Sequence, residues 1–493
     1  ARNSLTPPPP RPTTCKPCPP SLRRSVTTSP RRFPLPHPFC LPPPSLSSLY
    51  PPPMHPQGLI GLAALVAIAF ALSTDRTRIP WRLVAAGLAL QLVLAPLLLI
   101  VPGTSDAFAL IARFVAGVID RTQAGISFVF GPALADPAAG PWGFVFALHV
   151  LPVIIFFASL MAVLYHLGLI QLIIRALAAL LRSTLRVTGA EALAMAANVF
   201  VGQTEAPLTV KPLIPKMTTA QLMTLMTGGF ATIAGSVLAG YVLFLGADDP
   251  ADRALFTKHL LTASVLSAPA AFVFARLIIP ESQTPPADDA RLSWDDGDQH
   301  PTNILDAAAA GATQGLKLAL NVAAMLIAFL ALLALVNWPL ETLSQWGPVA
   351  DFRDTRSLPP FTLEYLLGLA LAPLAWTLGV AWSDAPLVGS LLGQKIFLTE
   401  FVAYANLGEL SHSAIDPDTG AEIPPALSAR SAQIAAYALC GFANVGSIAI
   451  QIGGLSAIAP ARRHDFARLA PRAMIAGALA SFTTAATASL FIS

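Results

Sequence analysis

Charged side chains are scarce in this sequence. Of its 493 residues, 12% are Asp, Glu, Lys or Arg, whereas 54% are hydrophobic. A soluble globular protein carries about 25% charged residues. The deficit argues against a water-soluble enzyme, a nucleic-acid-binding protein and a disordered scaffold. It leaves a polytopic helical membrane protein.

Cysteine is rare as well. Three of the four cysteines, Cys15, Cys18 and Cys40, lie within residues 1–53, and Cys440 lies alone in an apolar stretch. We therefore expect disulfides to contribute nothing to the fold. Cys15 and Cys18 form a CxxC pair without a second pair of ligands, so a zinc site is the weaker of its interpretations.

Residues 1–53 hold 18 of the 46 prolines and seven of the 30 basic residues, and they contain no acidic residue. Such a segment has too little apolar content to form a core. It is either a disordered Pro-rich tail or the product of a mis-assigned start. We favour the second, because Met54 directly precedes the first apolar run and no signal-peptide pattern lies ahead of it. The remainder carries 23 basic against 27 acidic residues, which leaves no basic field for nucleic acid.

Signatures of hydrolytic enzymes are also missing. The chain has no HExxH and no GxSxG, and its eight histidines do not cluster with cysteines or acids. An intramembrane hydrolase, in which Glu205 and Glu400 would form an acid pair, is therefore disfavoured. We therefore expect that the protein is not an enzyme and that it uses no cofactor.

Long apolar runs are what the sequence has in abundance. A spanning helix needs about 20 mostly apolar residues. The fold class that we predict is all-α, with about eight spanning helices, two re-entrant hairpins and two interfacial helices at 106–134 and 361–380. The predicted spans are 58–73, 81–102, 142–167, 219–246, 255–280, 313–338, 431–458 and 468–492.

Two segments, 190–215 and 385–410, are apolar on both sides of a polar centre. The first centre ends in Glu205 and the second contains Glu400. A carboxylate at mid-membrane costs about 2.5–3.5 kcal/mol on insertion scales, so it needs a compensating role. Irregular backbone at this depth is tolerated where it lines a cavity. Each segment therefore predicts a re-entrant hairpin with its tip inside the membrane.

Each hairpin is followed by a helix with a Gly-rich interruption, Gly229-Phe-Ala-Thr232 and Gly441-Phe-Ala-Asn444. Paired broken helices in corresponding positions indicate a secondary transporter with inverted repeats. The resulting divisions are the tail 1–53, scaffold helices 54–135, a third span plus first repeat 142–280 (hairpin 190–215, broken helix 219–246, helix 255–280), scaffold 303–380, and a second repeat 385–492 (hairpin 385–410, broken helix 431–458, helix 468–492).

At these residues the sequence resembles the concentrative nucleoside transporter family from Met54 to its end. The phrases that carry the resemblance are Asn198-Val-Phe-Val-Gly-Gln-Thr-Glu-Ala-Pro-Leu208, Gly229-Phe-Ala-Thr-Ile-Ala-Gly-Ser-Val237, Gly315-Leu-Lys-Leu-Ala-Leu-Asn-Val-Ala-Ala-Met-Leu-Ile-Ala-Phe329, Glu400-Phe-Val-Ala-Tyr404, Cys440-Gly-Phe-Ala-Asn-Val-Gly-Ser-Ile448 and Gln451-Ile-Gly-Gly-Leu455. The resemblance implies a homotrimer in a bacterial inner membrane that imports nucleosides by symport with Na+ or H+ through alternating access.

The resemblance also implies roles for individual residues. The nucleobase is expected at the first tip and the helix after it, and the ribose between the second hairpin and its broken helix. The implied substrate-binding residues are Gln203, Thr204, Glu205, Val237, Glu400, Phe442, Asn444 and Ser447. The positions implied for Na+ are Asn198, Val201, Thr232 and Ile233.

The chemistry of these side chains agrees with those roles. Amides and hydroxyls can pair with base edges, a carboxylate can accept from two ribose hydroxyls, and oxygen ligands suit sodium. Glu205 offers a proton site instead, and the residues favour sodium slightly. Purine and pyrimidine preference stays open, and a passive nucleoside facilitator is the alternative to a symporter.

Each group also has a structural interpretation. Glu205 and Glu400 could be paired with Lys211 or Lys395. Gln203 and Thr204 could cap a half-helix, and Asn444 and Ser447 could act as polar contacts between helices. Thr232 could bond the backbone of its own helix, and this interpretation has the same weight as that of an ion ligand.

Overall fold

The computed structural model describes residues 56–135, 145–246, 249–284, 301–356, 358–415 and 422–492, which lie in one compact unit. The Pro-rich segment 1–53, its CxxC pair and the expected start at Met54 lie outside the described residues. The described chain is helical except for one short antiparallel pair, β1 (Ala414–Ile415) with β2 (Glu422–Ile423). The expected helical class is confirmed, with this small hairpin added.

Several helices are apolar enough for a bilayer. Within the described residues, five are also long enough to cross one, at Trp81–Leu99, Phe146–His166, Thr219–Gly246, Pro250–Ile278 and Ile304–Gln345. Shorter apolar helices occupy Gln57–Ala71, Leu363–Thr377 and Val445–Ile458. The last long helix, α19 (Arg463–Ser489), carries charged side chains in its first turns, among them Arg463, Asp465 and Arg468. These charges lower its hydropathy although its second half is buried.

The N-terminal part runs from α1 to α7. Its elements are α1 (Gln57–Ala71), η2 (Arg76–Arg78), α2 (Trp81–Leu99), α3 (Thr104–Phe130), α4 (Pro132–Ala135), α5 (Phe146–His149), α6 (Leu151–His166) and α7 (Leu169–Leu185). Helix α7 is amphipathic and was not among the predicted elements. Its buried stripe, Ile170, Ile174, Leu181 and Leu185, follows the helical period, so the signal was present in the sequence.

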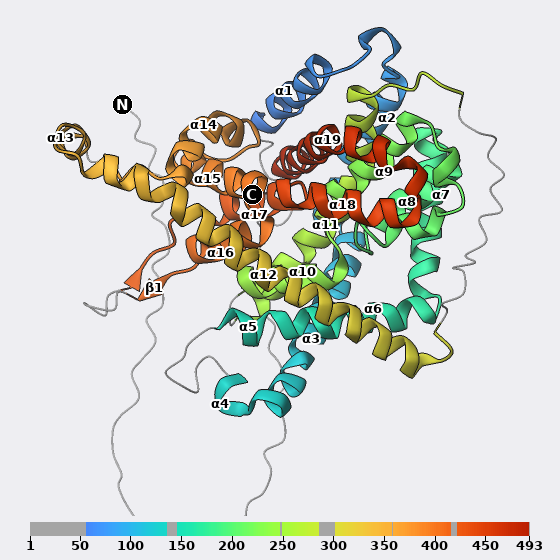
Figure 1. Ribbon diagram of the computed structural model, residues 1–493, viewed down its shortest axis with the longest axis horizontal. Coiled ribbons are helices and arrows are strands. Elements are labelled where there is room, and N and C mark those ends of the chain that lie inside the picture. Colours follow the sequence, from blue (N-terminus) through green and yellow to red (C-terminus); the bar gives the residue numbers. More distant parts are fainter. Residues whose placement is uncertain are drawn as a thin grey trace, which may run out of the picture. The chain divides into compact units, whose positions relative to one another are not determined.

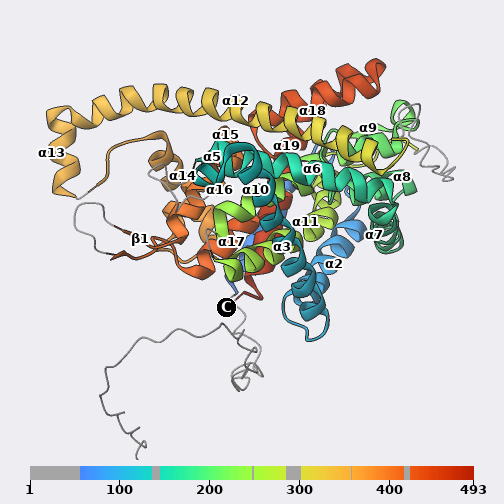
Figure 2. The ribbon, with the colours of Figure 1, turned by 90° about the horizontal axis from the view of Figure 1, so that it is seen from below.

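Helix α12 (Ile304–Gln345) has 42 residues and extends beyond the predicted span 313–338 at both ends. It runs along α6 in both ribbon views (Figures 1 and 2) and continues into α13 (Gly347–Thr355). Gly311 and Gly315 allow the two backbones to approach, because a Cβ on Gly315 would lie 2.8 Å from the Cα of Ile155. Small residues one turn apart are the usual means of close helix packing in membranes. Helix α14 (Leu363–Thr377) occupies the predicted interfacial segment 361–380.

The first repeat begins with α8 (Gly189–Asn198). After it come η3 (Ala206–Val210), η4 (Ile214–Lys216), α9 (Thr219–Ala231), α10 (Gly235–Gly246) and α11 (Pro250–Ile278). The second half of segment 190–215 thus holds two short 3-10 helices. Prolines at 207, 212 and 215 explain this, since each lacks a backbone N–H and disfavours a continuous α-helix.

The second repeat has two full hairpin helices, α15 (Ala385–Phe397) and α16 (Glu400–Ser411). The broken helix is α17 (Ala429–Leu439) followed by α18 (Val445–Ile458), and η5 (Pro460–Arg462) leads into α19. Helix α19 packs against α9 and α11 of the first repeat, and α18 also contacts α9 (Figure 1). The two repeats therefore share one core.

Within each repeat, the hairpin and the broken helix start together. In the first, Thr188 and Thr218 cap α8 and α9, and Gln221 joins the caps by donating to Thr188 Oγ1 at 3.3 Å. In the second, the Ser428 hydroxyl, which caps α17, donates at 2.7 Å to Asp384, the residue before α15. Each pair of helices is thus tied at its N-terminal end.

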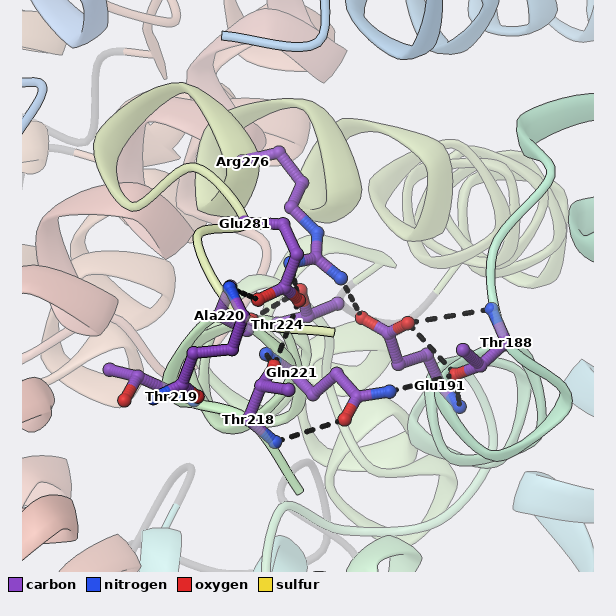
Figure 3. Close-up of polar contacts among 10 residues, drawn as sticks. Thr188, Glu191, Thr218, Thr219, Ala220, Gln221, Thr224, Arg276 and Glu281 are labelled. Atoms are coloured by element: carbon purple, nitrogen blue, oxygen red, sulfur yellow. Dashed lines mark hydrogen bonds and ion pairs between the residues drawn. The ribbon is translucent and has the colours of Figure 1, made fainter. Parts of the chain in front are cut away.

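A buried ion-pair network reinforces the tie in the first repeat (Figure 3). The Arg276 guanidinium, at the end of α11, binds Glu191 and also Glu281 at 2.9 Å. Glu281 accepts a further hydrogen bond from Thr218 at 2.8 Å. Arg276 and Glu191 are both buried, at 5% and 4% exposure. The network thereby fixes α8, α9 and α11 to one another.

Candidate functional site

The two broken helices meet at their interruptions. Helix α9 ends at Ala231 and α10 begins at Gly235, while residues 440–444 separate α17 from α18. Gly441 has a φ of +98°, and a Cβ there would lie 2.6 Å from the carbonyl oxygen of Phe230. Glycine is needed on both counts. The break of the second repeat therefore rests directly on the end of α9.

Glu400 lies at the start of α16, buried at 3% exposure. Its carboxylate accepts hydrogen bonds from Asn444 Nδ2 at 2.6 Å and from the Tyr241 hydroxyl at 3.0 Å. Tyr241 is itself stacked on Tyr404, with ring centroids 4.2 Å apart. The structure thus brings together the second tip, the second broken helix and helix α10 of the first repeat.

Asn444 has a second task. Its side-chain oxygen accepts the backbone N–H of Ser447 at 2.7 Å and so caps α18. Ser447 is buried at 3% exposure and Phe442 is half-buried. Asn444 is therefore both the cap of α18 and a donor to the carboxylate of α16, so it also makes the polar contact between helices that the structural interpretation describes.

Glu205 has partners on two sides of the first tip. It accepts the backbone N–H of Gly202 at 3.3 Å, and Gln314 Nε2 of α12 donates to its other oxygen. The contact with Gln314 joins the tip to the long helix α12. Since 109 residues separate the two side chains, the sequence alone did not reveal it.

The first tip also touches the second repeat. Thr204 packs against Gly454 of α18, where a Cβ would lie 2.7 Å from Thr204 Cγ2. Gln203 packs against Gly229 in the same way, because a Cβ on Gly229 would lie 2.9 Å from the Cβ of Gln203. The Oε1 of Gln203 is buried and has no hydrogen-bond partner. Val237 of α10 is buried at 1% exposure.

Asn198 is the last residue of α8 and is completely buried. Neither its Oδ1 nor its Nδ2 has a hydrogen-bond partner. Its amide lies beside Gly228 of α9, 3.1 Å from the position of a Cβ there. An unpaired buried polar atom costs about 1–3 kcal/mol, so a ligand that binds Oδ1 recovers the cost of leaving that oxygen unpaired. An amide oxygen suits a hard cation such as Na+.

Of the other expected ion ligands, Val201 lies three residues after Asn198, whereas Thr232 and Ile233 lie at the break that follows α9. Thr232 follows the end of α9, and its hydroxyl donates to the carbonyl of Gly228 at 2.9 Å. This is a bond to the backbone of its own helix, as the structural interpretation of Thr232 expects. Ile233 is buried at 1% exposure, and Val201 is half-buried beside Phe200, whose carbonyl accepts the N–H of Gly235.

The alternative pairing of the carboxylates with lysines does not occur. Within the described part of the chain, no ion pair joins Glu205 or Glu400 to a lysine. Lys211 is exposed, and Lys395 binds two backbone carbonyls. Nor do Gln203 and Thr204 cap η3, because its N-cap residue, Glu205, makes no side-chain cap bond.

Sequence analysis missed Tyr241, Gln314 and Gln451. Gln451 is buried at 1% exposure, donates to the Met226 carbonyl at 2.9 Å and keeps an unpartnered Oε1. Asn444, Ser447, Gln451 and Gly454 are spaced by three, four and three residues, so they share one face of α18. That spacing was a usable signal for Gln451. This face connects the two halves of the site.

Family models match three parts of the chain. Residues 259–489 match the "Na+ dependent nucleoside transporter C-terminus", residues 60–133 the corresponding "N-terminus", and residues 147–248 "Nucleoside recognition". An uncharacterized transporter of Haemophilus influenzae is 42% identical over 88% of this chain and 97% of its own length. The chain belongs to the Na+-dependent nucleoside transporter family. The expected family is confirmed.

Two further relatives are identical to this transporter to a similar extent. YutK of Bacillus subtilis, an uncharacterized transporter, is 43% identical over 88% of this chain and 99% of its own length. The sodium/nucleoside cotransporter 1 of Rattus norvegicus is 39% identical over 87% of this chain and 63% of its own.

Solved structures agree with the fold of this transporter. CNTnw in an inward-facing substrate-bound state is 41% identical, with a TM-score of 0.75 over 88% of this chain and 97% of that one. A variant of CNTnw in an outward-facing state gives a TM-score of 0.76 at 40% identity. This chain is therefore a multi-pass membrane transporter for nucleosides that works by concentrative import, and it is not an enzyme, as the sequence predicted.

Proposed function

We propose that this transporter couples nucleoside import to Na+, and that the ion binds at the break of the first broken helix. Asn198, Val201, Thr232 and Ile233 would supply oxygen ligands from side chains and from the backbone that the break frees. The observation that carries this proposal is the Asn198 amide, which is fully buried with both polar atoms unpartnered. Sodium is a transported co-substrate here, not a resident cofactor.

The nucleoside would bind between the two repeats. Gln203, Thr204 and Glu205 would face the base, with Val237 as an apolar wall. Glu400, Asn444 and Ser447 would face the ribose, with Phe442 beside it. Support comes from the shared face of α18, which contacts Thr204 at Gly454 and Glu400 through Asn444.

Coupling follows from the position of the ion site. Sodium at Asn198 would hold the end of α8 against the break of α9, and Gln203 rests on Gly229 of that same helix. An ion bound there stabilises the tip that presents the base contacts. Ion and nucleoside would then favour the same conformation, which is the requirement for a ligand to shift an equilibrium.

The first experiment is uptake of labelled uridine into proteoliposomes of the full chain. An inward Na+ gradient, an inward H+ gradient and no gradient are compared. Accumulation with Na+ alone supports the proposal, and accumulation with H+ alone assigns coupling to Glu205 instead. Equilibration without accumulation would establish a facilitator.

Asn198→Ala tests the ion site itself. The variant should raise the Na+ concentration for half-maximal uptake about tenfold or more, because a charge-assisted contact of about 1.5–3 kcal/mol is lost. Thr227→Val is the matched control, since Thr227 of the neighbouring helix α9 is also buried and has an unpartnered hydroxyl. Equal Na+ dependence in both variants would contradict the proposal.

A further inference from the structure

Lys395 is a fully buried lysine that the site described above does not use. It lies near the end of α15, in the first arm of the second hairpin, at 0% exposure. Its ammonium donates to the carbonyls of Ala438 at 2.9 Å and Cys440 at 2.8 Å. A charged side chain inside the membrane is costly, so its retention points to a role.

Those two carbonyls belong to the end of α17, whose last residue is Leu439. Carbonyls in the last turn of a helix lack intrahelical partners and carry the negative end of the helix dipole. Helix α15 itself ends at Phe397, two residues after Lys395. The ammonium therefore lies where two helix C-terminal ends favour a cation.

The first repeat has the same arrangement without the lysine. Asn198 occupies the end of α8, the corresponding hairpin helix, and its amide lies beside Gly228 near the end of α9. Counted from the shared Gly-Phe-Ala sequence at Gly229 and Gly441, Gly228 corresponds to Cys440. One repeat thus has a neutral, unpartnered amide near the end of its hairpin helix and beside the residue that corresponds to Cys440, where the other repeat has an ammonium.

We propose that Lys395 is a tethered cation, which gives the second repeat the positive charge that the first repeat takes from solution as the coupling ion. This inference rests on the proposed sodium site at Asn198. The ammonium holds α15 to the break of α17 and so positions the loop that carries Asn444, the partner of Glu400. Lys395 is a positioning residue, and the protein needs one exchangeable cation per nucleoside.

The test is Lys395→Met, which removes the charge and keeps an unbranched apolar stem. Lys258→Met is the matched control, because Lys258 is a partly buried lysine whose partners, the carbonyl of Leu99 and the hydroxyl of Ser105, lie at neither break. For each full-length protein in proteoliposomes, the Na+ dependence of uridine uptake and the charge moved per nucleoside are measured.

The wild type and Lys258→Met should show a non-cooperative Na+ dependence. In Lys395→Met a second Na+ must fill the vacated position, so the dependence should become cooperative, the half-maximal Na+ concentration should rise about tenfold, and more charge should move per nucleoside. A Lys395→Met protein with wild-type Na+ dependence and charge ratio would overturn the proposal.

If Lys395→Met is inactive, Lys395→Ala is assayed with n-propylammonium, which replaces the missing ammonium and most of its stem. Restored uptake supports the tethered cation, and no restoration overturns it. Na+-independent uptake by the wild type would instead contradict the proposed sodium coupling. In that case rescue of Lys395→Ala by the amine still tests Lys395 separately.

Discussion

At the scale of single residues, the polar groups of the site differ in whether their partners are present. Glu400 has two donors, Tyr241 and Asn444, whereas Asn198 has no partner at all. A satisfied group is held in position before the ligand arrives, and an unsatisfied group is one whose partner is the ligand. The two carboxylates of the hairpin tips are thus prepared in advance, while the ion site is completed by its ion.

Glu400→Gln should abolish nucleoside uptake. The carboxylate accepts from two donors, and an amide in its place turns one of its acceptors into a donor that faces another donor.

Tyr241→Phe removes one of the two hydrogen bonds and should weaken uridine binding about tenfold, because a bond to a charged group contributes about 1.5–3 kcal/mol.

Both variants are compared with the wild type by uridine uptake into proteoliposomes, by uridine binding in detergent and by gel filtration. Normal uptake by Glu400→Gln would remove Glu400 from the ribose site. An unfolded profile in gel filtration would exclude that variant as a test, and Tyr241→Phe then decides whether the carboxylate matters.

At the scale of elements, the sequence predicted the breaks better than the hairpins. Gly-rich interruptions after apolar runs are local signals, and the chain leaves helical conformation at both of them. The second half of segment 190–215 forms 3-10 helices because its three prolines disfavour a continuous α-helix. Helix α12 begins before its apolar span, where residues 307–310 are all alanine, the residue with the highest helical propensity. Contacts such as Gln314 with Glu205 join elements that are distant in sequence, so no local pattern announces them.

Arg276→Met should destabilise the first repeat more than any loss of a surface charge. Removing one partner of a buried ion pair leaves Glu191 uncompensated and costs about 3–5 kcal/mol. Arg78→Met, at an exposed pair with Asp75, should cost about 0–1 kcal/mol. Thermal unfolding in detergent measures both. If Arg276→Met melts at the same temperature as Arg78→Met, the network of Figure 3 contributes no stability.

At the scale of the whole molecule, the described helices divide by their surroundings. The apolar window of α11 is 89% buried, whereas that of α12 is only 17% buried. Helix α12 accordingly presents Leu320, Ile327 and Leu335 outward, at 60%, 73% and 60% exposure. A face of this kind meets lipid or other copies of the chain.

We propose that the transporter is a homotrimer, with α12 at the contact between protomers. Ile327→Arg should shift the detergent-solubilised protein from trimer to monomer in native mass spectrometry, because a buried unpaired charge opposes association. Leu172→Arg, on the exposed face of α7, is the control at 67% exposure. A wild-type monomer, or dissociation by both variants alike, would contradict this assembly.

Gln314 is a built-in competitor for Glu205. Its carboxamide N–H, donated to Glu205, is the same kind of donor as the ring N–H or amino group of a nucleobase. If Glu205 faces the base, as we propose, nucleoside binding exchanges one such hydrogen bond for another. The apparent affinity would then report a small difference, and shape and ribose contacts would carry most of the selectivity. The same exchange would release the first tip from α12, so that nucleoside binding and release of the tip would be one event.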